Sequence, residues 1–106
     1  MTGEPVRVCA EGDIAAGTAR AFMVGSSWIG VFHTSAGWYA IGNSCPHQGI
    51  SLAEGHVDDT SVTCYAHDRC YDLATGQGPG VNEIVPCYPV EVRGGEVFVT
   101  PVRRNR

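Results

Sequence analysis

The sequence predicts an all-β fold of short antiparallel strands, interrupted by one segment rich in Cys and His. Apolar and polar residues alternate in short runs, glycine is frequent at 14 of 106 residues, and helical patterning is nearly absent. A chain of this length has room for one core, so we expect a single domain over residues 1–106.

Strand patterns follow one another as expected for a meander with tight turns. The expected strands are residues 5–9, 18–24, 28–33, 38–42, 60–64, 71–73, 88–92 and 96–102. The last two alternate Val with polar residues around Gly94-Gly95, which predicts a hairpin. One helical turn is expected within residues 10–16, where acidic residues stand near the start and Gly17 follows the end.

Residues 43–73 differ from the strands on either side. This segment is rich in Cys, His, Gly and acidic residues and lacks the alternation of the flanking strands. It is typical of an insertion carried by a β scaffold, which is where functional residues usually lie.

Charge and composition exclude several function classes. The net charge is −4 and lysine is absent, which disfavours nucleic acid as a partner. No apolar run is long enough to cross a membrane, and the N-terminus does not resemble a secretory signal, so we expect a cytoplasmic protein. Five cysteines in a reducing compartment indicate metal binding rather than a disulfide framework.

Two short motifs carry the strongest chemical signal. Cys45-Pro46-His47 and Cys64-Tyr65-Ala66-His67 each place a thiolate and an imidazole within one tight turn. Thiolate and imidazole together suit zinc or an iron–sulfur cluster, and not calcium or magnesium. Two such pairs on one short chain predict a metal centre closed from two sides.

The two motifs and their surroundings resemble the Rieske family. C-x-H followed by C-x-x-H is the family signature, and the CPHQG, SLAEG and YDLATG stretches are similar to Rieske ferredoxins of bacterial aromatic-ring oxygenase systems. The resemblance implies an antiparallel β-sandwich with a cluster-binding loop subdomain at about residues 43–73. It also implies one [2Fe–2S] cluster, held by Cys45 and Cys64 on the inner iron and by His47 and His67 on the outer iron. Gly78–Gly80 would form the loop that covers this cluster.

The function implied by the resemblance is electron transfer. The chain would be a monomer that accepts single electrons from a flavin-dependent ferredoxin reductase and delivers them to a terminal aromatic-ring oxygenase. It would not be an enzyme itself, since we find neither a nucleophile–base pair nor a nucleotide-binding glycine loop. Two alternatives stay open: a Rieske-like small subunit of a reductase such as nitrite reductase, and a structural zinc module for protein interaction.

Several residues place the chain within this family. Ile50 and Ala66 stand where respiratory relatives have two further cysteines, and Arg69 stands where they have a serine. These differences predict a low-potential ferredoxin. Tyr71 stands where many ferredoxins have Phe, so its hydroxyl could donate to a cysteine sulfur. Asp68 replaces the commoner glycine after the second histidine.

The remaining cysteines and charges lead to two further expectations. Cys9, Cys70 and Cys87 are expected to be free thiols rather than ligands. Residues 43–73 carry five acids (Glu54, Asp58, Asp59, Asp68 and Asp72) and one base, so five minus one gives the whole net charge of −4. We expect this charge to steer basic partner surfaces to the cluster, and the arginines at positions 103, 104 and 106 to form a solvated tail.

Overall fold

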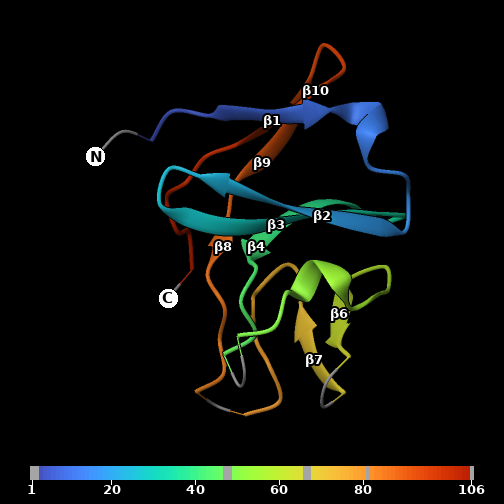
Figure 1. Cartoon of the computed structure of the whole chain (residues 1–106), viewed down its shortest axis with the longest axis vertical. Coiled ribbons are helices and arrows are strands. Elements are labelled where there is room, and N and C mark those ends of the chain that lie inside the picture. The colour runs from blue at the N-terminus through green and yellow to red at the C-terminus, as the bar shows by residue number, and fades with distance from the viewer. Residues whose placement is uncertain (1–2, 47–48, 66–67, 81, 106) are drawn as a thin grey trace.

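Three antiparallel sheets form the described part of the chain (Figure 1). The structure is a computed structural model that describes residues 3–46, 49–65, 68–80 and 82–105. The first sheet has the order β1 (Val6–Ala10), β10 (Glu96–Val99), β9 (Val90–Arg93). The second has the order β2 (Thr18–Val24), β3 (Ser27–Thr34), β4 (Gly37–Gly42), β8 (Cys87–Tyr88). The third has the order β5 (His56–Val57), β6 (Ser61–Cys64), β7 (Arg69–Asp72).

The β3–β4 pair is the middle layer of the molecule, because it is buried on both faces. Successive side chains of a strand point to opposite faces. Ile29 and Val31 therefore pack into a core shared with the first sheet. Phe32 and Ile41 face the other way, into a second core shared with the β6–β7 hairpin. The second core supports the segment that carries the candidate ligands.

The predicted meander and the C-terminal hairpin are confirmed. β2, β3 and β4 pair in sequence order. β9 and β10 are joined by Gly94-Gly95, whose φ angles are +59° and +80°. Positive φ at both central residues is the geometry of the turn that best matches strand twist, and glycine adopts it without a Cβ clash. The expected strand at 96–102 ends at Val99, and the one at 71–73 begins earlier, at Arg69.

Helical structure in the described residues is short. The predicted turn within residues 10–16 is the 3-10 turn η1 (Glu11–Asp13), where the Asp13 carboxylate accepts the Ala10 N–H at 3.0 Å. A second 3-10 turn, η2 (Leu52–Glu54), lies in the SLAEG stretch, where a turn is expected, whereas the two-residue strand β5 has no counterpart in the sequence prediction. None of the helices described here is long and apolar enough to cross a membrane.

The C-terminal residues are held against the body of the protein by hydrogen bonds, although Arg103 and Arg104 are exposed, as expected for a solvated tail. The Arg104 guanidinium donates to the Ala74 carbonyl at 2.7 Å. The Asn105 side chain accepts the Cys87 N–H at 2.8 Å and donates to the carbonyls of Thr75 and Val85. These bonds provide a partner for a buried β8 amide, which a strand edge would otherwise lack.

Candidate metal centre

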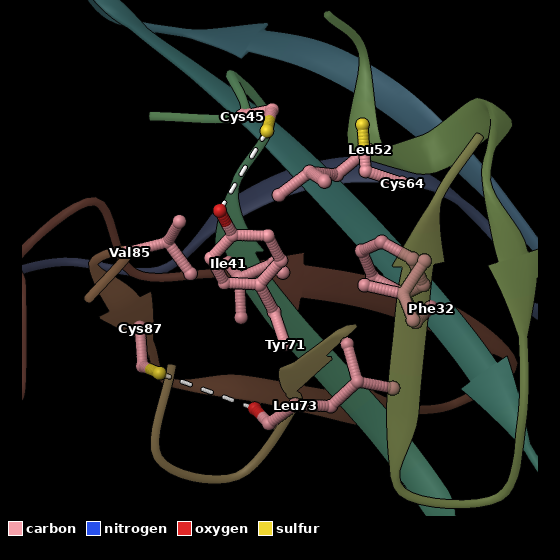
Figure 2. Packing of buried hydrophobic residues seen from close by; sticks show 10 residues of the cluster. Phe32, Ile41, Cys45, Leu52, Cys64, Tyr71, Leu73, Val85 and Cys87 are labelled. Carbon is pink, nitrogen blue, oxygen red and sulfur yellow. Dashed lines mark hydrogen bonds between the residues drawn. The ribbon is translucent and has the colours of Figure 1, made fainter. Parts of the chain in front are cut away.

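The two candidate cysteine ligands lie in the same core cluster although they come from different segments. Cys45 follows β4 and is 2% exposed, and Cys64 ends β6 and is 1% exposed. Figure 2 shows both side chains at one edge of this cluster, opposite Cys87. The other two candidates, His47 and His67, lie outside the described residues.

Buried Asn43 organises the loop that carries Cys45. Its side-chain Nδ2 donates to Ser51 Oγ at 2.8 Å, and its Oδ1 accepts the Ala53 N–H at 2.9 Å. The space for this amide depends on Gly30, since a Cβ there would lie 2.8 Å from Asn43 Oδ1. The sequence prediction did not include Asn43. Its only signal is a polar residue directly after an apolar strand and two residues before Cys45.

Backbone hydrogen bonds close the Cys45 turn. The Cys45 N–H donates to the Ile50 carbonyl at 2.9 Å, and the Gly49 N–H donates to the Cys45 carbonyl at 2.6 Å. Gly49 has a φ of +70°, which glycine adopts readily. The Cys45 backbone is therefore held by the hydrogen bonds of its own turn.

The turn that follows Cys64 contains an unusual backbone conformation. Cys64 and Arg69 are the last cross-strand pair of β6 and β7, and the Asp68 N–H donates to the Cys64 carbonyl at 2.9 Å. Asp68 has a φ of +55°, the one positive value among the described non-glycine residues. Asp tolerates this region better than most side chains do, which explains how it can stand where glycine is commoner.

Tyr71 approaches Cys45 as the sequence predicts. Its hydroxyl oxygen lies 3.6 Å from Cys45 Sγ, in the interior of the core cluster (Figure 2). Burial, and then the contact with Cys45, raise the pKa of Tyr71 well above its usual value near 10. The phenol therefore keeps its proton and can donate to a thiolate sulfur at Cys45.

The glycine-rich loop at residues 78–80 packs against Tyr71. A Cβ on Gly78 would lie 2.5 Å from Cε2 of the Tyr71 ring, so only glycine fits there. The Gly78 N–H donates to the Glu83 carbonyl at 2.6 Å. The loop thus contacts the side chain whose hydroxyl reaches Cys45.

The described donors fit an iron–sulfur cluster. Cys45 and Cys64 are two buried thiols at the same edge of one core, with a hydroxyl donor next to one of them. Iron–sulfur clusters are held by thiolates whose hydrogen bonds tune the reduction potential. Within the described ranges no group of three or more metal-ligating side chains comes together, and half of the predicted set falls outside those ranges.

Comparison with known proteins decides the family. The sequence profile described as the Rieske [2Fe-2S] domain matches residues 4–92. The chain belongs to the Rieske family. It therefore holds one [2Fe–2S] cluster, and among its relatives it resembles electron-carrying ferredoxins rather than catalytic enzymes.

Relatives and solved structures agree with this assignment. The chain is 34% identical to the ferredoxin component of the alkene monooxygenase system of Xanthobacter autotrophicus, over 91% of this chain and 80% of that protein. It is 33% identical to ferredoxin CarAc of Metapseudomonas resinovorans, over 89% of this chain and 91% of that one. A chain in the complex of oxygenase and ferredoxin in carbazole 1,9a-dioxygenase is 28% identical with a TM-score of 0.86, covering 99% of this chain and all of that one.

One further structure is similar in fold only. The nitrite reductase small subunit from Mycobacterium tuberculosis has a TM-score of 0.88 at 22% identity, covering 96% of this chain and 98% of that one. The predicted Rieske-type β-sandwich is confirmed by this likeness and by the ferredoxin structure above.

The other three cysteines of this Rieske ferredoxin form no disulfide, and their expected absence from the ligand set stays a prediction. Cys9 and Cys87 are buried and Cys70 is exposed. Burial raises the pKa of the Cys9 and Cys87 thiols, so both favour the protonated form.

Two of the acidic residues of the ferredoxin, Asp58 and Asp59, do not lie at the cluster end, contrary to the sequence expectation. Val57 pairs with Val62, so Asp58 and Asp59 lie in the turn at the opposite end of β6 from Cys64. Four residues of strand separate the two ends by about 13 Å. The Asp59 side chain accepts a hydrogen bond from Ser35.

Two other charges of this segment have structural partners. The Asp72 carboxylate caps the next turn, accepting the N–H groups of Ala74 and Thr75 at 2.9 Å. Arg69 pairs with Glu83, which lies outside the segment. Sequence position alone therefore overestimated the charge at the cluster end, because the chain reverses direction within the segment.

Proposed function

We propose that Cys45, His47, Cys64 and His67 are the four cluster ligands of this ferredoxin. The observation that carries the proposal is the placement of Cys45 and Cys64 together at one edge of a core, each at the start of a tight turn that leads to one of the histidines. Neutral imidazoles in place of two thiolates leave the reduced cluster with less negative charge, which raises the reduction potential relative to four-cysteine clusters.

The ligand set can be tested by single substitutions with cysteine controls on the same fold. Cys45→Ser and His67→Ala should lose the cluster or bind one with altered ligation. Cys70→Ser and Cys9→Ser should keep two irons and two acid-labile sulfides per chain. Electron paramagnetic resonance of the dithionite-reduced proteins reports the cluster type. An unchanged spectrum in Cys45→Ser would reject the set.

We further propose that the protein transfers electrons from a flavin-dependent ferredoxin reductase to a terminal oxygenase acting on aromatic compounds. Sequence identity of 34% to the ferredoxin component of an alkene monooxygenase system and of 32% to the ferredoxin subunit of a 3-phenylpropionate/cinnamic acid dioxygenase supports this role. The nitrite reductase small subunit is the second candidate, and similarity to it rests on fold. The zinc module is set aside, because the family profile describes an iron–sulfur domain.

Reduction kinetics separate the two candidates. A free shuttle should be reduced by a ferredoxin reductase and NADH, and should then reoxidise when mixed with an aromatic-ring oxygenase and its substrate. A fixed subunit should instead copurify with a larger reductase and accept electrons slowly outside it. Stable copurification together with failure to support any oxygenase would contradict the shuttle role.

We also propose that the ferredoxin acts as a monomer in the cytoplasm. Free thiols at Cys9, Cys70 and Cys87 support a reducing compartment, since an exposed thiol such as Cys70 oxidises outside one. Light scattering after size exclusion, with and without reductant, measures the oligomeric state. A reductant-independent dimer would contradict the proposal.

A further inference from the structure

The ion pair between Arg69 and Glu83 joins two segments of the cluster end. Arg69 is the first residue of β7 and the cross-strand partner of Cys64. Its Nη1 lies 2.7 Å from both carboxylate oxygens of Glu83, which stands in the segment between β7 and β8. The side chains are only 30% and 23% exposed, so solvent screens this pair less than an exposed one.

Glu83 in turn closes the glycine-rich loop. Its carboxylate accepts the Gly80 N–H at 2.9 Å, and its backbone carbonyl accepts the Gly78 N–H at 2.6 Å. The Glu83 N–H also donates to the Gly80 carbonyl at 3.0 Å. One residue thus holds both glycines and is itself held by Arg69.

The closed loop lies directly on Tyr71. Gly78 approaches the ring so closely that no side chain fits between them. The Tyr71 hydroxyl then reaches Cys45 Sγ at 3.6 Å, a long contact that a small movement of the ring would weaken. A continuous line of contacts therefore runs from the Cys64 side of the site, through the ion pair and the loop, to Cys45.

We propose that Arg69 and Glu83 are positioning residues that clamp the 78–83 loop on Tyr71 and thereby set the hydrogen bond from its hydroxyl to Cys45. The inference rests on the proposed ligand set, in which Cys45 binds the cluster. A donor to a ligand sulfur stabilises the more negative reduced state, so the clamp raises the reduction potential.

If Glu83 acted on the cluster through its charge alone, Glu83→Gln would shift the reduction potential in the opposite direction. Glu83→Gln removes a negative charge, which by itself favours the reduced cluster and raises the potential. The same change breaks the ion pair and loosens the loop, which weakens the Tyr71 bond and lowers the potential. The sign of the shift therefore separates the two explanations.

The experiment compares reduction potentials by protein-film voltammetry in two backgrounds. Glu83→Gln should lower the potential in the wild-type background. Combined with Tyr71→Phe, the same substitution should cause no lowering, because the hydroxyl that it displaces is gone. A rise in the wild-type background, or an equal shift in both backgrounds, would overturn the clamp.

Two further variants control for charge and for general loosening. Arg69→Lys keeps both charges, but the lysine side chain is one bond shorter and its ammonium cannot take the position of Nη1, so any lowering comes from geometry. If Glu83→Gln does not retain the cluster, Arg69→Lys decides: an unchanged potential would overturn the clamp. Glu96→Gln breaks the exposed ion pair with Arg7 on the first sheet and should leave the potential unchanged.

Amide exchange provides a readout that does not depend on electron transfer. Hydrogen–deuterium exchange in residues 77–84 should become faster in Glu83→Gln and remain slow in Glu96→Gln, since without the ion pair to Arg69 residue 83 holds the N–H groups of Gly78 and Gly80 less firmly. Loss of the cluster only in Cys45→Ser and in the histidine variants supports the ligand set independently. If the cluster is normal but Glu83→Gln shifts the reduction potential equally with and without the Tyr71 hydroxyl, the clamp is rejected and the ligand set stands.

Discussion

Replacing Asn43 with Ala removes the side chain that holds the Cys45 loop together. The substitution deletes the bonds to Ser51 Oγ and to the Ala53 N–H, which are 2.8 and 2.9 Å long. Each such bond contributes about 1 kcal/mol net, and a partner left without a bond away from water costs about 1–3 kcal/mol. We expect a total loss of about 2–3 kcal/mol, a large part of the roughly 5–15 kcal/mol typical of a domain.

The loss should appear first at the cluster and then in the whole fold. For a domain of this size a change of 2–3 kcal/mol corresponds to a melting temperature lower by about 10–20 °C. Visible absorption follows the cluster and far-ultraviolet circular dichroism follows the sheets, both at one fixed scan rate because cluster loss is irreversible. The absorption signal should be lost at a lower temperature than the sheet signal in Asn43→Ala.

Asn82→Ala is the matched control, because Asn82 is exposed. Ser51→Ala removes one of the two bonds and should cost roughly half as much. A melting temperature for Asn43→Ala within about 2 °C of both the wild type and Asn82→Ala would refute the reasoning. Asn43 would then fill space without organising the loop.

Three other substitutions test separate parts of the structure. Tyr71→Phe should lower the reduction potential measured by voltammetry. The difference from the wild type should stay constant as the pH rises past 10, because the raised pKa of Tyr71 keeps its hydroxyl protonated. An unchanged potential would mean that the hydroxyl does not act on Cys45. Asn105→Ala should destabilise the fold by about 1–3 kcal/mol in thermal unfolding, since Cys87, Thr75 and Val85 lose a partner; stability equal to that of Asn82→Ala would contradict this. Asp68→Asn should slow reduction of the ferredoxin by its reductase more than the double substitution Asp58→Asn with Asp59→Asn does, because of these three residues only Asp68 lies in the turn after Cys64. Stopped-flow experiments across a salt series measure both rates. A larger effect of the double substitution would place docking at the other end of the hairpin.

The strands were predictable because their signals are local. Alternation and Gly-Gly define β9 and β10 within about a dozen residues, and the register follows from the turn. β5 was missed because two residues carry no detectable period. The burial of β3–β4 on both faces also lies beyond local pattern, since it depends on sheets formed by residues far away in the sequence.

In the candidate site, too, the residues with local sequence signals were predictable and those that depend on distant contacts were not. The ligand motifs and Tyr71 could be proposed from the sequence because residue type and spacing carry their chemistry. Asn43 and Glu83 could not, because their roles depend on partners that only the folded chain brings near. Arg69 shows why a family comparison alone is insufficient here. The resemblance suggested only that Arg69 stands in place of a serine, whereas the structure shows its guanidinium bonded to Glu83, which closes the glycine-rich loop. In the proposed clamp, Arg69 influences the reduction potential through the position of Tyr71.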